Sequence, residues 1–148
     1  MKTTIAFYLF ILVSCGSLHA QKISDAQKEA IMAKKVAFIT NELQLTPLEA
    51  QTFWPVYNQY QAEIESVKKL RKQELLTVNK DTLSSFSSAE LQQLIDNEFV
   101  YEQQELDIKK KYYDGEFEKV LTNQKVVKLF RAEQLFKIYL LKEIQNKQ

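Results

Sequence analysis

Apolar residues recur at steps of three and four along most of the chain after residue 24, with polar residues between them. This spacing places the apolar side chains on one face of an α-helix, and no stretch shows the alternation typical of a strand. The pattern divides into four segments, residues 24–44, 47–79, 87–120 and 122 onward. We therefore predict an all-α fold of four helices, in which long central helices and short links form antiparallel hairpins.

The clearest helix start lies in the segment LTPLEAQTFWPVYNQY, residues 45–60. Thr46 is a suitable N-cap, Pro47 suits the first helical position, and Glu49 can accept a hydrogen bond from the Thr46 backbone N–H. The apolar face that follows consists of Phe53, Val56, Tyr57, Tyr60, Ile64 and Val67. Pro55 lies inside this helix and lacks an N–H, which predicts a kink or a restart.

Similar signals begin the other three helices. Ser87 and Glu90 have the spacing of a capping box, and so do Ser24 and Gln27. Thr122 begins the fourth helix, which is apolar over most of its circumference. A helix of that kind is usually enclosed by others, so we expect the fourth to be the most buried.

The third helix carries two apolar stripes. The main stripe consists of Leu91, Ile95, Phe99, Leu106, Tyr113, Phe117 and Val120. The second, rotated by roughly 100°, consists of Leu94, Tyr101, Ile108 and Tyr112. Two interpretations remain open. Both stripes can be buried between the second and fourth helices, or the stripe that carries the tyrosines can be an exposed surface for a client or a second copy.

Trp54 lies off the apolar face of its helix. We interpret it as a packing anchor against another helix rather than a platform for a ligand. Two basic runs, residues 68–72 and Lys109, Lys110 and Lys111, can either line a cradle for acidic clients or be solvated faces paired with nearby glutamates. The second interpretation is favoured, because charge runs on long helices usually face solvent.

Residues 1–20 have the pattern of an export signal, with Lys2 before the apolar run IAFYLFILV. We favour cleavage after Ala20, which leaves a single helical domain, residues 21–148, in the periplasm. The alternative is that the sequence ending at Cys15 is a lipobox, in which case the protein is anchored through an acylated Cys15.

Composition argues against several functions. Lys2 would leave with the signal, so the 20 basic and 19 acidic residues of the chain would become equal in number. A neutral domain gives no general reason to expect nucleic acid as a partner. The single cysteine and the single histidine also lie before residue 21. We therefore expect no enzymatic activity, no cofactor and no site for soft metals.

Two helix starts share a leucine and a threonine: Leu45-Thr46-Pro47 and Leu121-Thr122-Asn123. Together with the export signal, they resemble the Spy/CpxP family of periplasmic LTXXQ proteins. The segment FWPVYNQY is similar to a branch described as sensors of ECF-type sigma factors. Gln51 lies beyond the spacing of the motif, and Gln124 lies one residue short of it.

The resemblance implies a small helical protein, often dimeric, that binds unfolded clients or restrains an envelope stress sensor. Our leading hypothesis is a chaperone-like protein of the envelope that binds unfolded or flexible proteins. The alternatives are a regulatory partner of a membrane stress sensor or anti-sigma protein, and a structural interaction domain.

Overall fold

The computed structural model describes residues 25–79 and 83–146, and within these ranges it contains four α-helices and no strand. The helices are α1 (Asp25–Leu43), α2 (Pro47–Leu75), α4 (Ser88–Lys111) and α5 (Asn123–Gln145), with a π-helical turn, η1 (Tyr112–Glu116), and a 3₁₀ turn, η2 (Phe117–Lys119), after α4. The predicted all-α class is confirmed. The predicted export signal lies outside the described residues.

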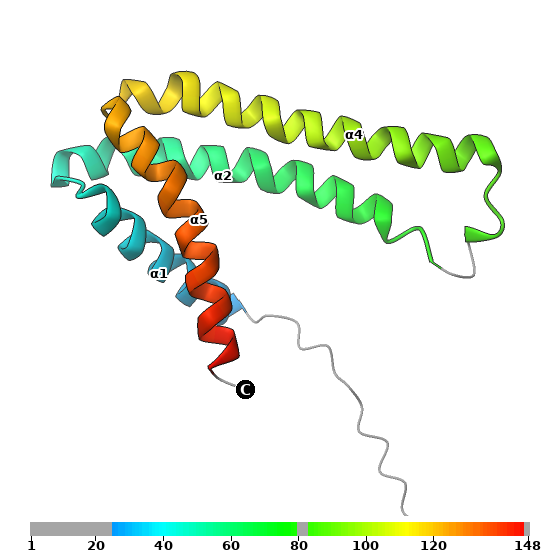
Figure 1. Cartoon of the computed structure of the whole chain (residues 1–148), viewed down its shortest axis with the longest axis horizontal. Coiled ribbons are helices and arrows are strands. Elements are labelled where there is room, and N and C mark those ends of the chain that lie inside the picture. The colour runs from blue at the N-terminus through cyan, green and yellow to red at the C-terminus, as the bar shows by residue number, and fades with distance from the viewer. Residues whose placement is uncertain (1–24, 80–82, 147–148) are drawn as a thin grey trace, which may run out of the picture.

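The helices form two arms that diverge from one junction (Figure 1). α2 and α4 run side by side in opposite directions and make the longer arm. α1 and α5, the first and last helices, pack on each other and make the second arm. The beginning of α2, the turns after α4 and the beginning of α5 all meet at the junction.

Local signals determine where α2 and α4 begin. The Glu49 backbone N–H donates to Thr46 Oγ1 at 3.3 Å, and the Thr46 N–H donates to Glu49 Oε2 at 2.8 Å. Ser87 and Glu90 make the same pair of bonds, at 3.3 and 2.7 Å. Both capping boxes predicted at these positions are confirmed. Ser24 lies outside the described residues.

The beginning of α5 is held differently. Thr122 occupies the N-cap position but makes no side-chain capping bond. Instead, Lys125 Nζ donates to the Glu49 carboxylate at 2.7 Å and to the Gln44 carbonyl at 3.1 Å. Gln44 has a φ of 49°, in the left-handed region that commonly ends a helix, and it follows the last residue of α1. One ammonium group therefore links three helix ends.

α2 continues through Pro55 as one helix, so the predicted restart does not occur. Phe53 and Tyr57, on either side of the proline, are both buried at the junction. Their packing offsets the backbone hydrogen bond that Pro55 cannot donate. α2 ends at Leu75, earlier than the predicted end near Asn79.

The third predicted helix does not continue unchanged to residue 120. α4 ends at Lys111, and the wider η1 turn and the tighter η2 turn follow. Gly115 lies within η1, but a Cβ at this position would meet no other atom within 4 Å, so the turn does not depend on the absence of a side chain. The change of pitch directs Tyr112 and Phe117 into the junction, where both are buried.

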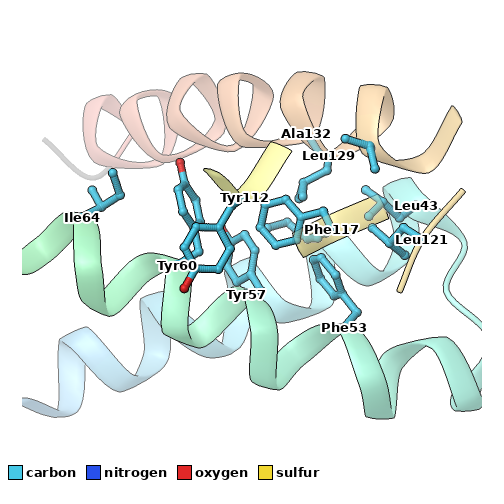
Figure 2. Packing of buried hydrophobic residues seen from close by; sticks show 12 residues of the cluster. Leu43, Phe53, Tyr57, Tyr60, Ile64, Tyr112, Phe117, Leu121, Leu129 and Ala132 are labelled. Carbon is cyan, nitrogen blue, oxygen red and sulfur yellow. The ribbon is translucent and has the colours of Figure 1, made fainter. Parts of the chain in front are cut away.

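An aromatic core fills the junction (Figure 2). Phe117 is fully buried, and its ring lies 5.8 Å from Phe53, 6.2 Å from Tyr57 and 5.6 Å from Tyr60. Trp54 packs edge-on against Phe53 of the same helix at 5.0 Å and lies partly buried against this core. The other buried members are Ile39, Leu43, Ile64, Tyr112, Leu121, Val126, Leu129 and Ala132. Leu45 packs against this cluster from the link before α2.

α5 is not enclosed by other helices as the prediction supposed, and α2 contains more fully buried residues, five against four. Its buried residues are Val126, Leu129, Ala132 and Phe136. Its other apolar residues are largely exposed: Val127, Phe130, Ile138, Leu141 and Ile144. The reason is that α5 leaves the junction alongside α1 alone, so only one side of the helix is covered (Figure 1).

Candidate functional site

α4 is attached to α2 by polar side chains along its inner side. Arg71 of α2 forms ion pairs with Glu98, with Glu102 at 3.8 Å and with Glu105 at 3.5 Å. Nearer the end of the arm, Asn97 Nδ2 donates to Glu74 Oε1 at 2.5 Å. These bonds fix which face of α4 is turned toward α2.

At the junction end of α4, Glu63 of α2 also attaches this segment to α2 by polar bonds. It accepts hydrogen bonds from Lys111 Nζ at 2.9 Å and from the Tyr112 hydroxyl at 2.7 Å. The bond from Lys111, followed by that from Tyr112, lowers the pKa of Glu63. Lys111 is therefore paired, as the favoured interpretation of the basic runs predicts, and Lys68 is likewise bonded to Glu65 at 3.4 Å. Lys109 and Lys110 are exposed at the surface.

The stripe that carries the tyrosines is not an exposed surface, so this sequence hypothesis is wrong. Tyr112 is 1% exposed, and its ring lies 5.3 Å from Tyr60. Tyr101 is half-buried, and burial, with a hydrogen bond to Glu74 of α2, raises the pKa of its hydroxyl. Ile108 packs against the core. The helix contacts α2 on this side, which leaves these side chains inside the arm.

The main stripe of the third predicted helix, in contrast, is largely exposed along α4. Ile95 is 52% exposed, Phe99 64% and Leu106 45%, whereas Tyr113 and Phe117 at its far end belong to the junction. We call Leu91, Ile95, Phe99 and Leu106 the outer stripe of α4. Exposed apolar residues gathered on one helix face form a candidate surface for binding another protein. The alternative in which both stripes are buried is therefore also wrong.

The architecture explains this exposure. Along its length α4 has α2 as its neighbour, because α5 turns away with α1 at the junction (Figure 1). α4 has no fully buried residue. A helix with one neighbour can cover one stripe, and the polar bonds to Arg71, Glu74 and Glu63 assign that place to the stripe with the tyrosines. The outer stripe is left without a covering helix among the described residues.

The outer stripe leads toward a second apolar surface on α5. Tyr113 lies on the same line of the helix as Ile95 and Leu106, and its ring contacts Phe130 of α5 at 5.7 Å. Phe130 is exposed, together with Val127 on the same side of α5. From Leu91 to Tyr113 the helix rises by roughly 33 Å. This is long enough to contact an extended segment of another protein.

A polar cluster lies beneath this surface at the junction. Glu133 of α5 accepts hydrogen bonds from the hydroxyls of Tyr57 at 2.8 Å and Tyr113 at 2.7 Å. Burial, followed by the nearby Glu133 charge, raises the pKa of both tyrosines, so both remain neutral donors. Lys35 lies 5.2 Å from the centre of the Tyr57 ring and donates to Gln61 at 2.9 Å, and burial lowers its pKa. The cluster joins α1, α2, η1 and α5.

Other kinds of site receive no support from the described part of the chain. Residues 25–79 and 83–146 contain no group of three or more acidic, histidine or cysteine side chains placed to hold a metal ion. No described helix is long and apolar enough to cross a membrane. Comparisons with protein-family models, with curated proteins and with solved structures give no match.

Proposed function

We propose that this protein is a non-enzymatic, chaperone-like binding protein of the cell envelope. It holds apolar segments of unfolded or flexible proteins on the outer stripe of α4. The observation that carries this proposal is the exposure of Ile95, Phe99 and Leu106 on one face of α4. The opposite face of this helix is held to α2 by polar bonds. Contact between such a face and another apolar segment is favourable, at about 25 cal/mol for each Å² removed from water.

The envelope setting comes from the sequence. The predicted export signal and the two starts at Leu45-Thr46 and Leu121-Thr122 resemble the Spy/CpxP family, and that resemblance implies a role in envelope stress. An apolar stripe recognises many sequences, because burial of apolar surface has little directional preference. Such breadth suits a protein that binds unfolded clients more than one that recognises a single folded sensor.

The proposal is tested by suppression of the aggregation of a chemically unfolded client. We expect the purified protein to suppress light scattering at an equimolar ratio. The double variant Ile95→Ser and Phe99→Ser should suppress it at least about tenfold less effectively, since each side chain buried against a client contributes about 1.5 to 3 kcal/mol. Leu48→Ser is the matched control, because Leu48 is an exposed apolar residue at the other end of α2.

Equal suppression by the double variant and the control would exclude the outer stripe as the client surface. Absence of suppression by the unaltered protein would favour the alternative role as a regulatory partner of one membrane stress sensor. Sedimentation of each variant tests a third possibility. If the unaltered protein is a homodimer and the double variant is a monomer, then a second copy covers the outer stripe.

A further inference from the structure

The outer stripe of α4 ends in a pocket at the far end of the longer arm. The pocket has a volume of about 500 Å³ and apolar walls. It is lined by Leu75 at the end of α2, by Val78 and Leu83 from the segment between the helices, and by Leu94 and Phe99 of α4. A volume of this size lies within the range of small ligand sites and admits a bulky apolar side chain.

The pocket and the outer stripe form one continuous surface. Leu91, Ile95 and Phe99 belong to the outer stripe and also line the pocket. A segment bound along the outer stripe would therefore pass the mouth of the pocket. An apolar side chain of that segment could enter it and act as the anchor of the complex.

The surroundings of the pocket are acidic. Glu74 and Glu98 lie in its lining. Glu74 accepts hydrogen bonds from two neutral groups, the Asn97 amide and the Tyr101 hydroxyl. Among the described residues, Arg71 is the one cation that pairs with Glu98, and it also pairs with Glu102 and Glu105. Residues 83–105 contain five acidic residues and no basic residue. The α4 side of the cavity therefore carries an excess of negative charge.

We propose that this pocket selects client segments in which a bulky apolar residue is flanked by lysine or arginine. The inference rests on the proposed function and specifies which clients the outer stripe prefers. The apolar side chain fills the pocket, and the flanking cation lies near the Glu74 carboxylate. Acidic segments and fatty acids, which carry a negative charge, are disfavoured at the same place because like charges would be brought together.

The test uses short fluorescent peptides that differ only in the residues flanking a central phenylalanine. One peptide carries flanking lysines, the second glutamates, and in the third the phenylalanine of the first is replaced by serine. By fluorescence anisotropy at low salt, we expect the lysine peptide to bind on the order of tenfold more tightly than either of the others. The advantage over the glutamate peptide should shrink as salt is added, since exposed charges are screened.

Two variants locate the effect. Glu74→Gln keeps the acceptor for Asn97 but removes the charge, so it should lower the affinity for the lysine peptide and raise that for the glutamate peptide. Glu118→Gln, at an exposed position in η2, is the control and should change neither. Leu83→Phe adds volume at the pocket and should weaken the lysine peptide severalfold.

Equal affinities for the lysine and glutamate peptides, or equal effects of Glu74→Gln and Glu118→Gln, would overturn the inference. If the two peptides bound equally well to the unaltered protein but less tightly to the double variant Ile95→Ser and Phe99→Ser, the proposed function would stand without this selectivity. If no peptide bound and no client were protected, both would fail. A change of sedimentation caused by Leu83→Phe would instead assign the pocket to a second copy, which also overturns the inference.

Discussion

Glu49 shows how much one side chain contributes to the arrangement of this fold. Its carboxylate accepts a hydrogen bond from the Thr46 backbone and another from Lys125, which also reaches the carbonyl of Gln44. The end of α1 and the beginnings of α2 and α5 therefore share one polar cluster. The bond from Lys125, followed by that from Thr46, lowers the pKa of Glu49 to about 2.

We predict that the stability of the protein falls in acid through Glu49. The pKa of Glu49 is lower in the folded protein than the value of about 4.3 expected in the unfolded chain. Its contribution is thus fully present above about pH 5 and is lost as the pH falls toward 2. Thermal unfolding followed by circular dichroism should show a lower midpoint across this range.

The variant Glu49→Gln separates this contribution from that of other carboxylates. It should have a lower midpoint than the unaltered protein at neutral pH and a shallower decline in acid. Glu63 and Glu90, whose pKa values are also lowered, account for the decline that remains. Glu118→Gln should retain the original slope. Parallel curves for Glu49→Gln and the unaltered protein would show that this carboxylate has no such role.

Among the elements, α4 is the one whose two faces differ most in what they do. Tyr112, in the η1 turn that continues the inner face of α4, is 1% exposed and donates to Glu63, whereas Phe99 on the outer face of α4 is 64% exposed. We predict that Tyr112→Ser lowers the free energy of unfolding by about 3 to 5 kcal/mol, as loss of a buried aromatic side chain commonly does. Phe99→Ser should change it by no more than about 0.5 kcal/mol. Urea unfolding of the two variants gives both values.

A similar loss in both variants would mean that the outer stripe is covered in solution, by a second copy for instance. A small loss in Tyr112→Ser would contradict the assignment of Tyr112 to the core. Tyr101→Ser is a useful intermediate case, because Tyr101 is half-buried and bonded to Glu74.

The contrast between capping and burial shows what the sequence of an element can predict. The boxes at Thr46 and Ser87 depend on residues three positions apart, so the sequence predicts them correctly. The two stripes of α4 are also visible in the sequence. Which of them faces α2 depends on partners such as Arg71 and Glu63, which lie tens of residues away. Periodicity identifies the faces of a helix but not its neighbours, so neither open interpretation was right, and the one with an exposed tyrosine stripe exchanged the roles of the two stripes.

At the scale of the whole molecule, the pairing of α1 with α5 was beyond the reach of the sequence patterns. Short links favour contacts between successive helices, but Phe38 of α1 packs 5.6 Å from Phe136 of α5, near the opposite end of the chain. Because the apolar faces of the first and last helices pack against each other, neither helix lies along the outer stripe of α4. The candidate binding surface is therefore a consequence of topology rather than of any local motif.

The two arms are joined at the junction by Glu133. This residue of α5 holds Tyr57 of α2 through one carboxylate oxygen and Tyr113 of η1 through the other. Both hydroxyls belong to side chains that pack in or against the aromatic core. If the carboxylate were absent, these two hydroxyls and the Gln61 amide, which donates at 3.4 Å, would lose this acceptor. Since hydrogen bonds to charged groups contribute about 1.5 to 3 kcal/mol each, Glu133 is central to the attachment of α5 to the longer arm.

We predict that Glu133→Ala lowers the free energy of unfolding by about 2 to 4 kcal/mol in urea. Glu133→Gln should cost less, because its amide can still bond both hydroxyls. The control Glu118→Ala should leave the free energy of unfolding unchanged. A loss in Glu133→Ala no larger than the loss in this control would contradict the bonds assigned to the Glu133 carboxylate.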